Sequence, residues 1–318
     1  MQRRMLVLAC IAALMLGAGA RAQESKPAPA ATKTYTIGYS QCNSGEPWRA
    51  QMDADIKAAA KEHSNIKLIA KDAQNEGMRQ MSQVKEFVTA KVDAIIISPK
   101  DNNLTPVVAE AFDAGIPVIV LDRKVLGDKY TVFIGADNRL IGAQVGEWVK
   151  KTLGGSGNVV ELKGLSSSTP AQERSEPFRA AIKDTKIKIV YDADMEWLKP
   201  KAHEKMQAAL ARNPNKGSIQ LVYGANDPAA IAAYEVAKDA GREKEMKFVG
   251  VDALPNEGVA AVRIGMLDAT FEYPNGAKEA IGAALEIFAG KKPEKNITLG
   301  TRLFTKENVD KGGEKVGP

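Results

Sequence analysis

The sequence predicts an α/β protein of two similar lobes, each built on a doubly wound parallel sheet, with short hinge strands joining them. Short β-branched apolar runs alternate with amphipathic segments from Tyr35 onward, which is typical of strand–helix units with right-handed crossovers. Most of these runs are continuously apolar, as in strands that are buried on both faces of a parallel sheet. The alternation also runs through the chain twice, with more strands than one compact sheet holds.

The elements follow in order along the chain. The stripe of Trp48, Met52 and Ile56 predicts an amphipathic helix over Trp48–Lys61. Glycines at 115, 241 and 265 mark the ends of later helices before strands. The strands are expected at Tyr35–Ser40, Ile66–Lys71, Ala94–Ser98, Pro117–Leu121, Val132–Ile134, Val159–Leu162, Ile187–Val190, Ile219–Val222, Phe248–Val251 and Ala269–Phe271.

The division into lobes is expected where the alternation restarts. The first set of units ends near Asp137, and a helix over Asn138–Leu153 begins the second. No long linker separates the sets, so the connections should be short hinges near Asp137, Tyr273 and Leu299. We expect an N-terminal lobe of residues 35–137 plus 274–299 and a C-terminal lobe of residues 138–273 plus 300–318.

Residues 1–22 have the pattern of a cleaved secretory signal peptide. Two arginines precede the apolar run Met5–Leu16, and Ala20-Arg21-Ala22 fits the A-x-A cleavage pattern. The run is shorter than the roughly 20 residues of a membrane-spanning helix. An uncleaved anchor and a lipoprotein modified at Cys10 are the alternatives. We expect export to the periplasm, with residues 23–34 as a flexible lead-in.

Removal of this segment changes the bulk properties of the chain. Three basic residues and no acidic residue precede Gln23, so the formal charge falls from +5 to +2. A chain so near neutrality has no electrostatic footprint for nucleic acid. Cys42 becomes the only cysteine, which excludes an intrachain disulfide and leaves either a buried inert thiol or a ligand-facing one. We expect a monomer.

The positions directly after the strands are unusually polar and aromatic. Ligands of doubly wound sheets bind beyond the carboxyl ends of the strands. Paired donors and acceptors beside aromatic rings suit a neutral sugar or polyol. The charges nearly cancel, whereas a phosphate or carboxylate site needs surplus basic residues or a glycine-rich helix start. The candidate ligand-binding residues are Gln41, Glu46, Trp48, Arg49, Asp122, Arg123, Arg174, Trp197, Asn226, Asp252 and Glu272.

Each of these residues also has a purely structural interpretation. Asp122 or Asn226 could cap a helix, Trp48 could be a core residue, and Arg174 could be a surface charge. Their shared placement at strand ends favours the binding interpretation for the set.

Four local patterns make a family resemblance specific. They are Val120-Leu121-Asp122-Arg123, Ala136-Asp137-Asn138, Ala225-Asn226-Asp227 and Val249-Gly250-Val251-Asp252. From about Tyr35 to about Gly290, the chain resembles the pentose and hexose solute-binding proteins of ABC importers, of the ribose-binding type with the type I periplasmic fold. The resemblance implies that the sugar is held by Asp122, Arg123, Arg174, Trp197, Asn226 and Asp252. It also implies an ABC transporter permease as partner.

The loop after the first strand departs from the ribose-binding pattern. Ribose binders place an Asn-Pro-Phe-Phe type segment there. Ser40-Gln41 followed by Glu46 and Trp48-Arg49 looks more like the galactofuranose-binding branch. The sequence leaves open whether the ligand is a furanose, a pyranose or a polyol.

Other classes of function find less support. The chain has no dinucleotide, Walker or nucleophile-elbow motif, and we expect no cofactor. His63 and His203 are its only histidines and fall in predicted helices, so no metal site is expected. Glycoside hydrolysis would need two opposed carboxylates, which Glu46, Asp122, Asp252 and Glu272 could supply. A repressor of this fold would need a DNA-binding helix pair before residue 35. A periplasmic sugar sensor would use the same fold and pocket.

Overall fold

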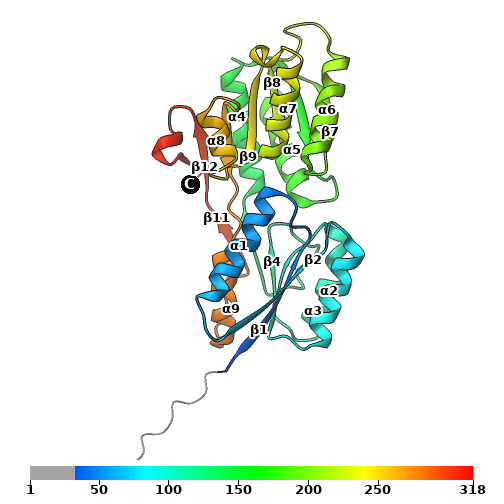
Figure 1. Ribbon diagram of the computed structural model, residues 1–318, viewed down its shortest axis with the longest axis vertical. Helices are drawn as coiled ribbons and strands as arrows, with labels where there is room; N and C mark the ends of the chain where they lie inside the picture. Colours follow the sequence, from blue (N-terminus) through cyan, green and yellow to red (C-terminus); the bar gives the residue numbers. More distant parts are fainter. Residues whose placement is uncertain (1–32, 318) are drawn as a thin grey trace, which may run out of the picture. The chain divides into compact units, whose positions relative to one another are not determined.

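The computed structural model describes residues 33–317. The predicted signal peptide and nearly all of the lead-in therefore lie outside the described residues. The described chain forms two sheets with helices on both faces of each (Figure 1), which confirms the predicted α/β class. No helix in residues 33–317 is both long enough and apolar enough to cross a membrane.

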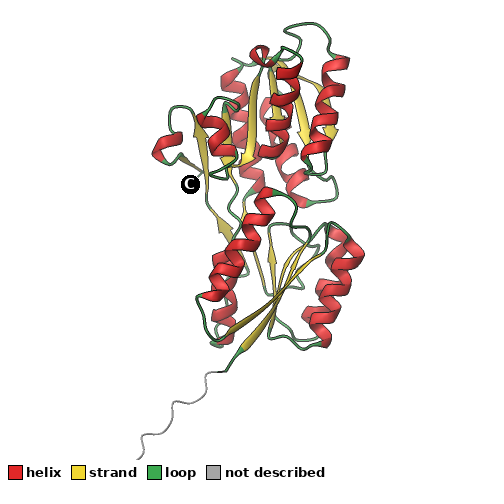
Figure 2. Cartoon of the chain, viewed as in Figure 1, coloured by secondary structure: helices red, strands yellow, loops and turns green. Residues whose placement is uncertain are grey.

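The first sheet contains six strands in the order β11-β5-β4-β3-β1-β2, and all of its pairings are parallel. Two helix pairs cover it, and Figure 2 shows them on opposite faces of the sheet. The elements of this first lobe are β1 (Tyr35–Gln41), α1 (Pro47–Lys61), β2 (Ile66–Asp72), α2 (Gly77–Thr89), β3 (Ala94–Ser98), α3 (Thr105–Asp113), β4 (Val118–Leu121), β5 (Val132–Ala136), α9 (Ala277–Phe288) and β11 (Asn296–Leu299).

The second sheet contains seven strands in the order β13-β12-β10-β9-β8-β6-β7. Its five consecutive strands from β6 to β10 pair in parallel, whereas β12 and β13 pair antiparallel at one edge. The elements of this second lobe are α4 (Asn138–Thr152), β6 (Ser156–Lys163), α5 (Thr169–Ile182), β7 (Lys186–Asp194), α6 (Lys199–Arg212), β8 (Leu221–Gly224), α7 (Asp227–Asp239), β9 (Lys247–Asp252), α8 (Gly258–Arg263), β10 (Ala269–Glu272), β12 (Thr301–Thr305) and β13 (Glu314–Val316).

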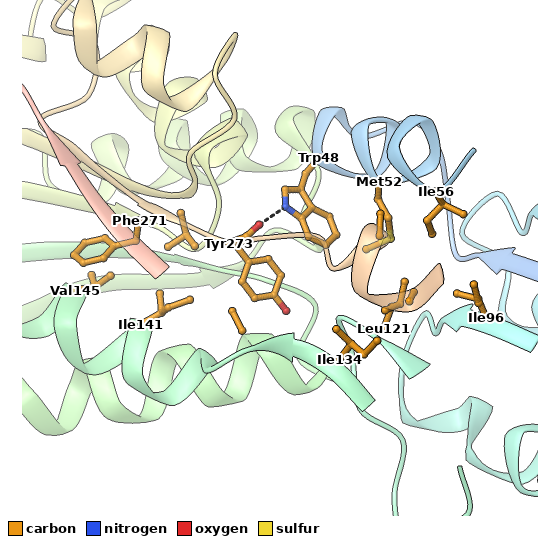
Figure 3. Packing of buried hydrophobic residues seen from close by; sticks show 14 of the residues in the cluster. Trp48, Met52, Ile56, Ile96, Leu121, Ile134, Ile141, Val145, Phe271 and Tyr273 are labelled. Atoms are coloured by element: carbon orange, nitrogen blue, oxygen red, sulfur yellow. Dashed lines mark hydrogen bonds between the residues drawn. The ribbon is translucent and has the colours of Figure 1, made fainter. Parts of the chain in front are cut away.

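Burial on both faces explains why the central strands are continuously apolar. Successive side chains of a strand point to opposite faces. In β3, Ile96 packs with residues of α1 and α9, whereas Ile95 and Ile97 pack with residues of α2 and α3. Figure 3 shows Ile96 beside Met52 and Ile56 of α1. Each apolar side chain that is fully buried contributes roughly 1.5–3 kcal/mol to folding.

The chain passes between the two sheets three times. It crosses at Asp137 between β5 and α4, at residues 273–276 between β10 and α9, and at Gly300 between β11 and β12. These crossings are short, as the predicted fold class requires. They coincide with the positions near Asp137, Tyr273 and Leu299 at which hinges were expected.

Two features of the sheets differ from the sequence prediction. The three strands after residue 295 were not predicted, because they are only three to five residues long and none is a continuously buried apolar run. The second sheet is also mixed rather than wholly parallel, since β12 and β13 run antiparallel. Antiparallel edge strands need no buried apolar run on both faces, so the pattern that revealed the core strands is missing there.

Candidate functional site

A cavity lies between the carboxyl-end loops of the two sheets. Its empty volume, which includes open solvent at its mouth, is about 310 Å³. Nine of the eleven predicted site residues line it. The full lining is Glu46, Trp48, Arg49, Asp122, Arg123, Pro170, Arg174, Trp197, Asn226, Asp252 and Tyr273.

In the first lobe, Arg49 and Asp122 form a buried ion pair. Arg49 Nη2 lies 2.8 Å from Asp122 Oδ2. Arg49 Nη1 donates to Gln41 Oε1 and to Ser98 Oγ, each at 2.9 Å. Burial by itself would raise the pKa of Asp122, but the Arg49 and Arg123 guanidiniums hold it below its ordinary value. Asp122 is therefore an ionised acceptor.

Gln41 supports this pair from behind the cavity. The residue is buried and does not line the cavity. Its side-chain oxygen accepts hydrogen bonds from Arg49 and from the Cys42 backbone N–H. Its amide donates to Tyr39 Oη at 2.7 Å. Gln41 thus orients Arg49 from a position outside the cavity lining.

Two guanidinium N–H groups in the cavity wall are unsatisfied. Arg49 Nε and Arg123 Nε are both buried and have no hydrogen-bond partner among residues 33–317. Arg123 Nη1 donates to the Lys100 carbonyl, and its guanidinium lies 5.7 Å from the centre of the Trp197 ring. The nearest carboxylate oxygens lie beyond hydrogen-bond distance, at 3.7 Å for Arg123 Nε and Asp122 Oδ2 and at 4.0 Å for Arg49 Nε and Glu46 Oε2. A buried N–H without a hydrogen bond costs about 1–3 kcal/mol, so each group favours a ligand that brings an oxygen.

In the second lobe, Arg174 is anchored by two acceptors. Its Nε donates to Asn138 Oδ1 at 2.8 Å and its Nη1 donates to the Ala225 carbonyl at 2.6 Å. The guanidinium also lies 4.3 Å from the centre of the Tyr273 ring. α4 and α5 approach closely at Gly142, where a Cβ would lie 2.2 Å from the Arg174 carbonyl oxygen. Arg174 is therefore an ordered part of the wall, and the surface-charge interpretation does not hold.

Trp197 and Asn226 are held against each other. The Trp197 indole N–H donates to Ser168 Oγ at 3.2 Å, and its ring packs on Gly164, where a Cβ would lie 2.1 Å from the ring. Asn226 Oδ1 accepts from the Ala229 N–H as the N-cap of α7, while Nδ2 donates to the Trp197 carbonyl. Asn226 is thus both a helix cap and a cavity residue.

Tyr273 is a cavity residue that the sequence analysis did not select. The Trp48 indole N–H donates to its carbonyl at 2.7 Å (Figure 3). Its hydroxyl donates to Asp122 Oδ1 at 3.0 Å and also lies 3.3 Å from Asn138 Nδ2. Tyr273 therefore connects the crossing segment to both lobes.

The structure does not bring Glu272 to the cavity. Glu272 lines a neighbouring depression, and one of its carboxylate oxygens lies 3.8 Å from Arg302 Nε. Successive residues of a strand point in opposite directions. The selection of Glu272 instead of Tyr273 therefore took the wrong one of two adjacent positions. The rise in polarity at the end of β10 was the available signal, and it did not distinguish the two residues.

Three wall residues have backbone conformations that are unusual for side chains other than glycine. The φ angles are 65° for Asp122, 68° for Trp197 and 131° for Asp252. Such conformations cost about 1–3 kcal/mol each and persist where the surroundings enforce them, often at functional sites. In this protein they occur at the ends of strands or in the loops that follow, where they place three side chains in the cavity wall.

The cavity carries balanced formal charges and no metal-binding cluster. Three arginines of the wall stand against Glu46, Asp122 and Asp252. The structure, as far as it describes the chain, contains no group of three or more histidine, cysteine, aspartate or glutamate residues that could hold a metal ion. Cys42 is buried behind the wall, and burial raises the pKa of its thiol. The thiol is therefore protonated, and Cys42 is not among the residues that line the cavity.

Comparison with known proteins defines the class. A model of the periplasmic binding protein domain matches residues 37–292, and the chain belongs to that family. It is 32% identical to the galactofuranose-binding protein of Escherichia coli, over 99% of this chain and 98% of the relative. It is 29% identical to the ribose import binding protein of Bacillus subtilis, over 90% and 92%. These relatives are binding proteins rather than enzymes.

A solved structure supports the same fold. The fructose-binding periplasmic domain of a hybrid two-component system superposes with a TM-score of 0.84 at 40% identity, over 87% of this chain and 93% of that one. The family resemblance and the type I periplasmic fold predicted from the sequence are therefore confirmed.

Proposed function

We propose that this protein captures a neutral monosaccharide or polyol between its two lobes and delivers it to the permease of an ABC importer. The observation that carries the proposal is the pair of unsatisfied, buried N–H groups, Arg49 Nε and Arg123 Nε, in a charge-balanced wall. A hydroxyl or ring oxygen of a sugar supplies the acceptor for each. An anionic ligand would face Glu46 and Asp122 as well as the arginines, which disfavours it.

Aromatic rings complete the fit to a sugar. Trp48 comes from the first lobe, Trp197 comes from the second, and Tyr273 comes from the crossing between them. Rings at these positions offer apolar surface to the C–H face of a sugar. The relatives named above are described as galactofuranose, ribose and fructose binders, which supports the same ligand class.

Contacts across the mouth of the cavity support a closing motion. The Lys124 backbone N–H donates to Thr169 Oγ1 at 3.0 Å, and Lys124 Nζ lies 2.9 Å from Glu173 Oε1. Ser167 Oγ donates to Asp101 Oδ2 at 3.3 Å. We infer that a ligand touching both lobes favours this closed arrangement over an open one, since differential affinity is what shifts such an equilibrium. The permease then distinguishes the closed form from the open form.

A second candidate function uses the same pocket. The similarity to the periplasmic domain of a hybrid two-component system, at 40% identity, favours a role in handing ligand state to a membrane sensor. Affinity purification of the ligand-bound protein from its native membrane distinguishes the two, because it recovers either permease subunits or a sensor kinase.

Location in the periplasm is part of this proposal. It rests on the family and on the pattern in residues 1–22. Mass spectrometry of the exported protein is expected to find a chain that begins at Gln23. A cytoplasmic protein with an intact Met1, or one with lipid on Cys10, would contradict it.

A thermal-shift screen tests the ligand class. D-galactose, D-ribose, D-fructose and myo-inositol represent neutral ligands, and D-galacturonate with D-ribose 5-phosphate are matched anionic controls. A ligand at about 100 times its Kd stabilises the folded state by about 2.7 kcal/mol. At least one neutral compound is expected to raise Tm, with no response to its anionic counterpart. Stabilisation by the anions alone would overturn the proposal.

A further inference from the structure

A second buried carboxyl lies behind the cavity wall at Asp227, the first residue of α7. The Asp227 side chain is fully buried. Its Oδ1 accepts from Thr270 Oγ1 at 2.6 Å and its Oδ2 accepts from the Ala253 N–H at 2.7 Å. Two glycines leave room for it, because a Cβ at Gly250 or Gly258 would lie 2.2 or 1.8 Å from one of its oxygens. The fold therefore accommodates this carboxyl specifically.

Asp252 stands in front of Asp227 in the cavity wall. Its side chain is 7% exposed and makes no hydrogen bond to any protein group in residues 33–317. Asp252 also directly precedes Ala253, whose N–H bonds Asp227. A carboxyl that is more than nine-tenths buried, unpartnered and part of a cavity wall points to an interaction with a ligand.

The groups around the two carboxyls do not neutralise both. Burial is the main cause that raises the pKa of each, to about 7 for Asp227 and well above the ordinary value for Asp252. Asp227 raises the pKa of Asp252 further, and Glu257 and Glu46 act in the same direction. Arg174 is the cation that opposes these effects. Geometry places the carboxyls near each other, because Asp227 Oδ1 lies 2.2 Å from where a Cβ of Gly250 would be, and Gly250 and Asp252 stand on the same face of β9. One positive charge therefore faces two neighbouring carboxyls.

We propose that Asp227 is a positioning residue for sugar binding, which shares one proton with Asp252 so that Asp252 meets the ligand as a hydroxyl donor as well as an acceptor. The inference rests on the proposed function and deepens it. A sugar hydroxyl both donates and accepts, so a half-protonated pair satisfies it in either orientation. Above neutral pH the shared proton is released to water and the pair becomes doubly negative.

Ligand affinity is then linked to proton binding. A bound sugar removes the remaining water from Asp252 and so raises the cost of a second negative charge. The affinity is expected to be constant near pH 6 and to fall by about three- to tenfold by pH 8.5, with at most about tenfold per pH unit for one proton.

Calorimetric titration of the full-length mature protein tests the inference, with D-galactose, D-ribose, D-fructose and myo-inositol at pH 6, 7 and 8.5. Asp227→Asn keeps the shape of the side chain and removes the second ionisable group. Its affinity is expected to fall less between pH 6 and pH 8.5 than that of the wild type, because Asp227 no longer raises the pKa of Asp252. Thr270→Val removes the hydrogen bond that favours ionised Asp227, and is expected to move the fall in affinity to higher pH.

Glu161→Gln is the matched control. Glu161 is a buried carboxyl in the same lobe, burial raises its pKa, and it does not line the cavity. This variant is expected to keep the wild-type pH dependence of binding. A wild-type affinity that is flat with pH, or a decline in Asp227→Asn as large as that of the wild type, would overturn the inference.

The ligand-free protein separates this inference from the proposed function. If none of the four compounds binds at any pH, the proposed function fails, but the proton shared by Asp227 and Asp252 can still be tested through the pH dependence of stability. Because the folded-state pKa of Asp227 is raised, its contribution to stability is present at pH 4 and is lost as the pH rises through about 7. Urea unfolding is expected to show a larger loss of stability between pH 4 and pH 7 in the wild type than in Asp227→Asn. Parallel pH profiles for the two proteins would refute the shared proton.

Discussion

Each lobe places one aspartate at the end of a central strand, and the two lobes treat that aspartate in opposite ways. Asp122 follows β4 and contacts Arg49 and Tyr273. Asp252 ends β9 and has Asp227 as its neighbour. The pKa of the first is lowered despite burial, and the pKa of the second is raised by burial and by Asp227. The same residue type therefore becomes a fixed anion in one wall and a protonatable group in the other.

The largest expected effect is on the free energy of unfolding, and it separates the two aspartates when each is replaced by asparagine. Asp122→Asn leaves Arg49 buried without its anion, and such a loss costs about 3–5 kcal/mol of stability. Asp252→Asn removes a repulsion and is expected to change stability by less than about 1 kcal/mol. Urea unfolding of the two variants at pH 7 measures both. Equal losses would show that the two sites are alike.

The pH dependence of stability sharpens the same contrast. The lowered pKa of Asp122 means that its stabilisation is present above the unfolded-state value near 3.8 and is lost as the pH falls through its folded-state value. Asp122→Asn is therefore expected to lack part of the acid-side loss of stability that the wild type shows. An unchanged acid limb in this variant would contradict the ion pair.

The next effect concerns the contribution of Arg123, in the first lobe, to ligand binding. Arg123→Ala removes one of the two unsatisfied N–H groups and the contact with Trp197. It is expected to weaken binding of the sugar found in the thermal screen by about 2–5 kcal/mol. Arg139→Ala is the control, because Arg139 forms an exposed pair with Glu176. Calorimetric affinities of Arg123→Ala and wild type that agree within about threefold would remove Arg123 from the site.

The smallest effect tests the contact between the lobes. Lys124 pairs with Glu173 across the mouth, whereas Lys129 pairs with Asp113 within the first lobe. Exposed pairs of this kind contribute about 0–1 kcal/mol. Lys124→Ala is expected to enlarge the radius of gyration of the ligand-free protein slightly in small-angle scattering, and Lys129→Ala is not. An identical radius for both variants would place the closing contacts elsewhere.

Much of the fold was predictable because its central strands are buried on both faces. Runs such as Ala94–Ser98 are apolar at every position except the last, so the residue types alone indicate that the strand is buried. The edge strands after residue 295 are short and not continuously buried, so their residue types give no such indication. The antiparallel direction of β12 and β13 therefore became visible only in the structure.

The cavity was predictable as far as its residues follow strands. Asp122 and Asp252 both stand at strand ends, where the rule for doubly wound sheets directs attention. Gln41 and Asp227 act from behind the wall, and the sequence does not show which polar side chain points inward at such a place. The space for Asp227 depends on Gly250 and Gly258, which meet it only after the chain has folded.

The hydroxyl of Tyr273 has a consequence for how the molecule can open. It contacts the carboxylate of the first lobe and the Asn138 amide of the second from a segment that crosses between them. Any separation of the lobes must break one of these two bonds or swing the phenol with one partner. Both bonds lie at the cavity wall, so the proposed opening would change the surroundings of the Asp122 carboxylate or of Asn138 directly.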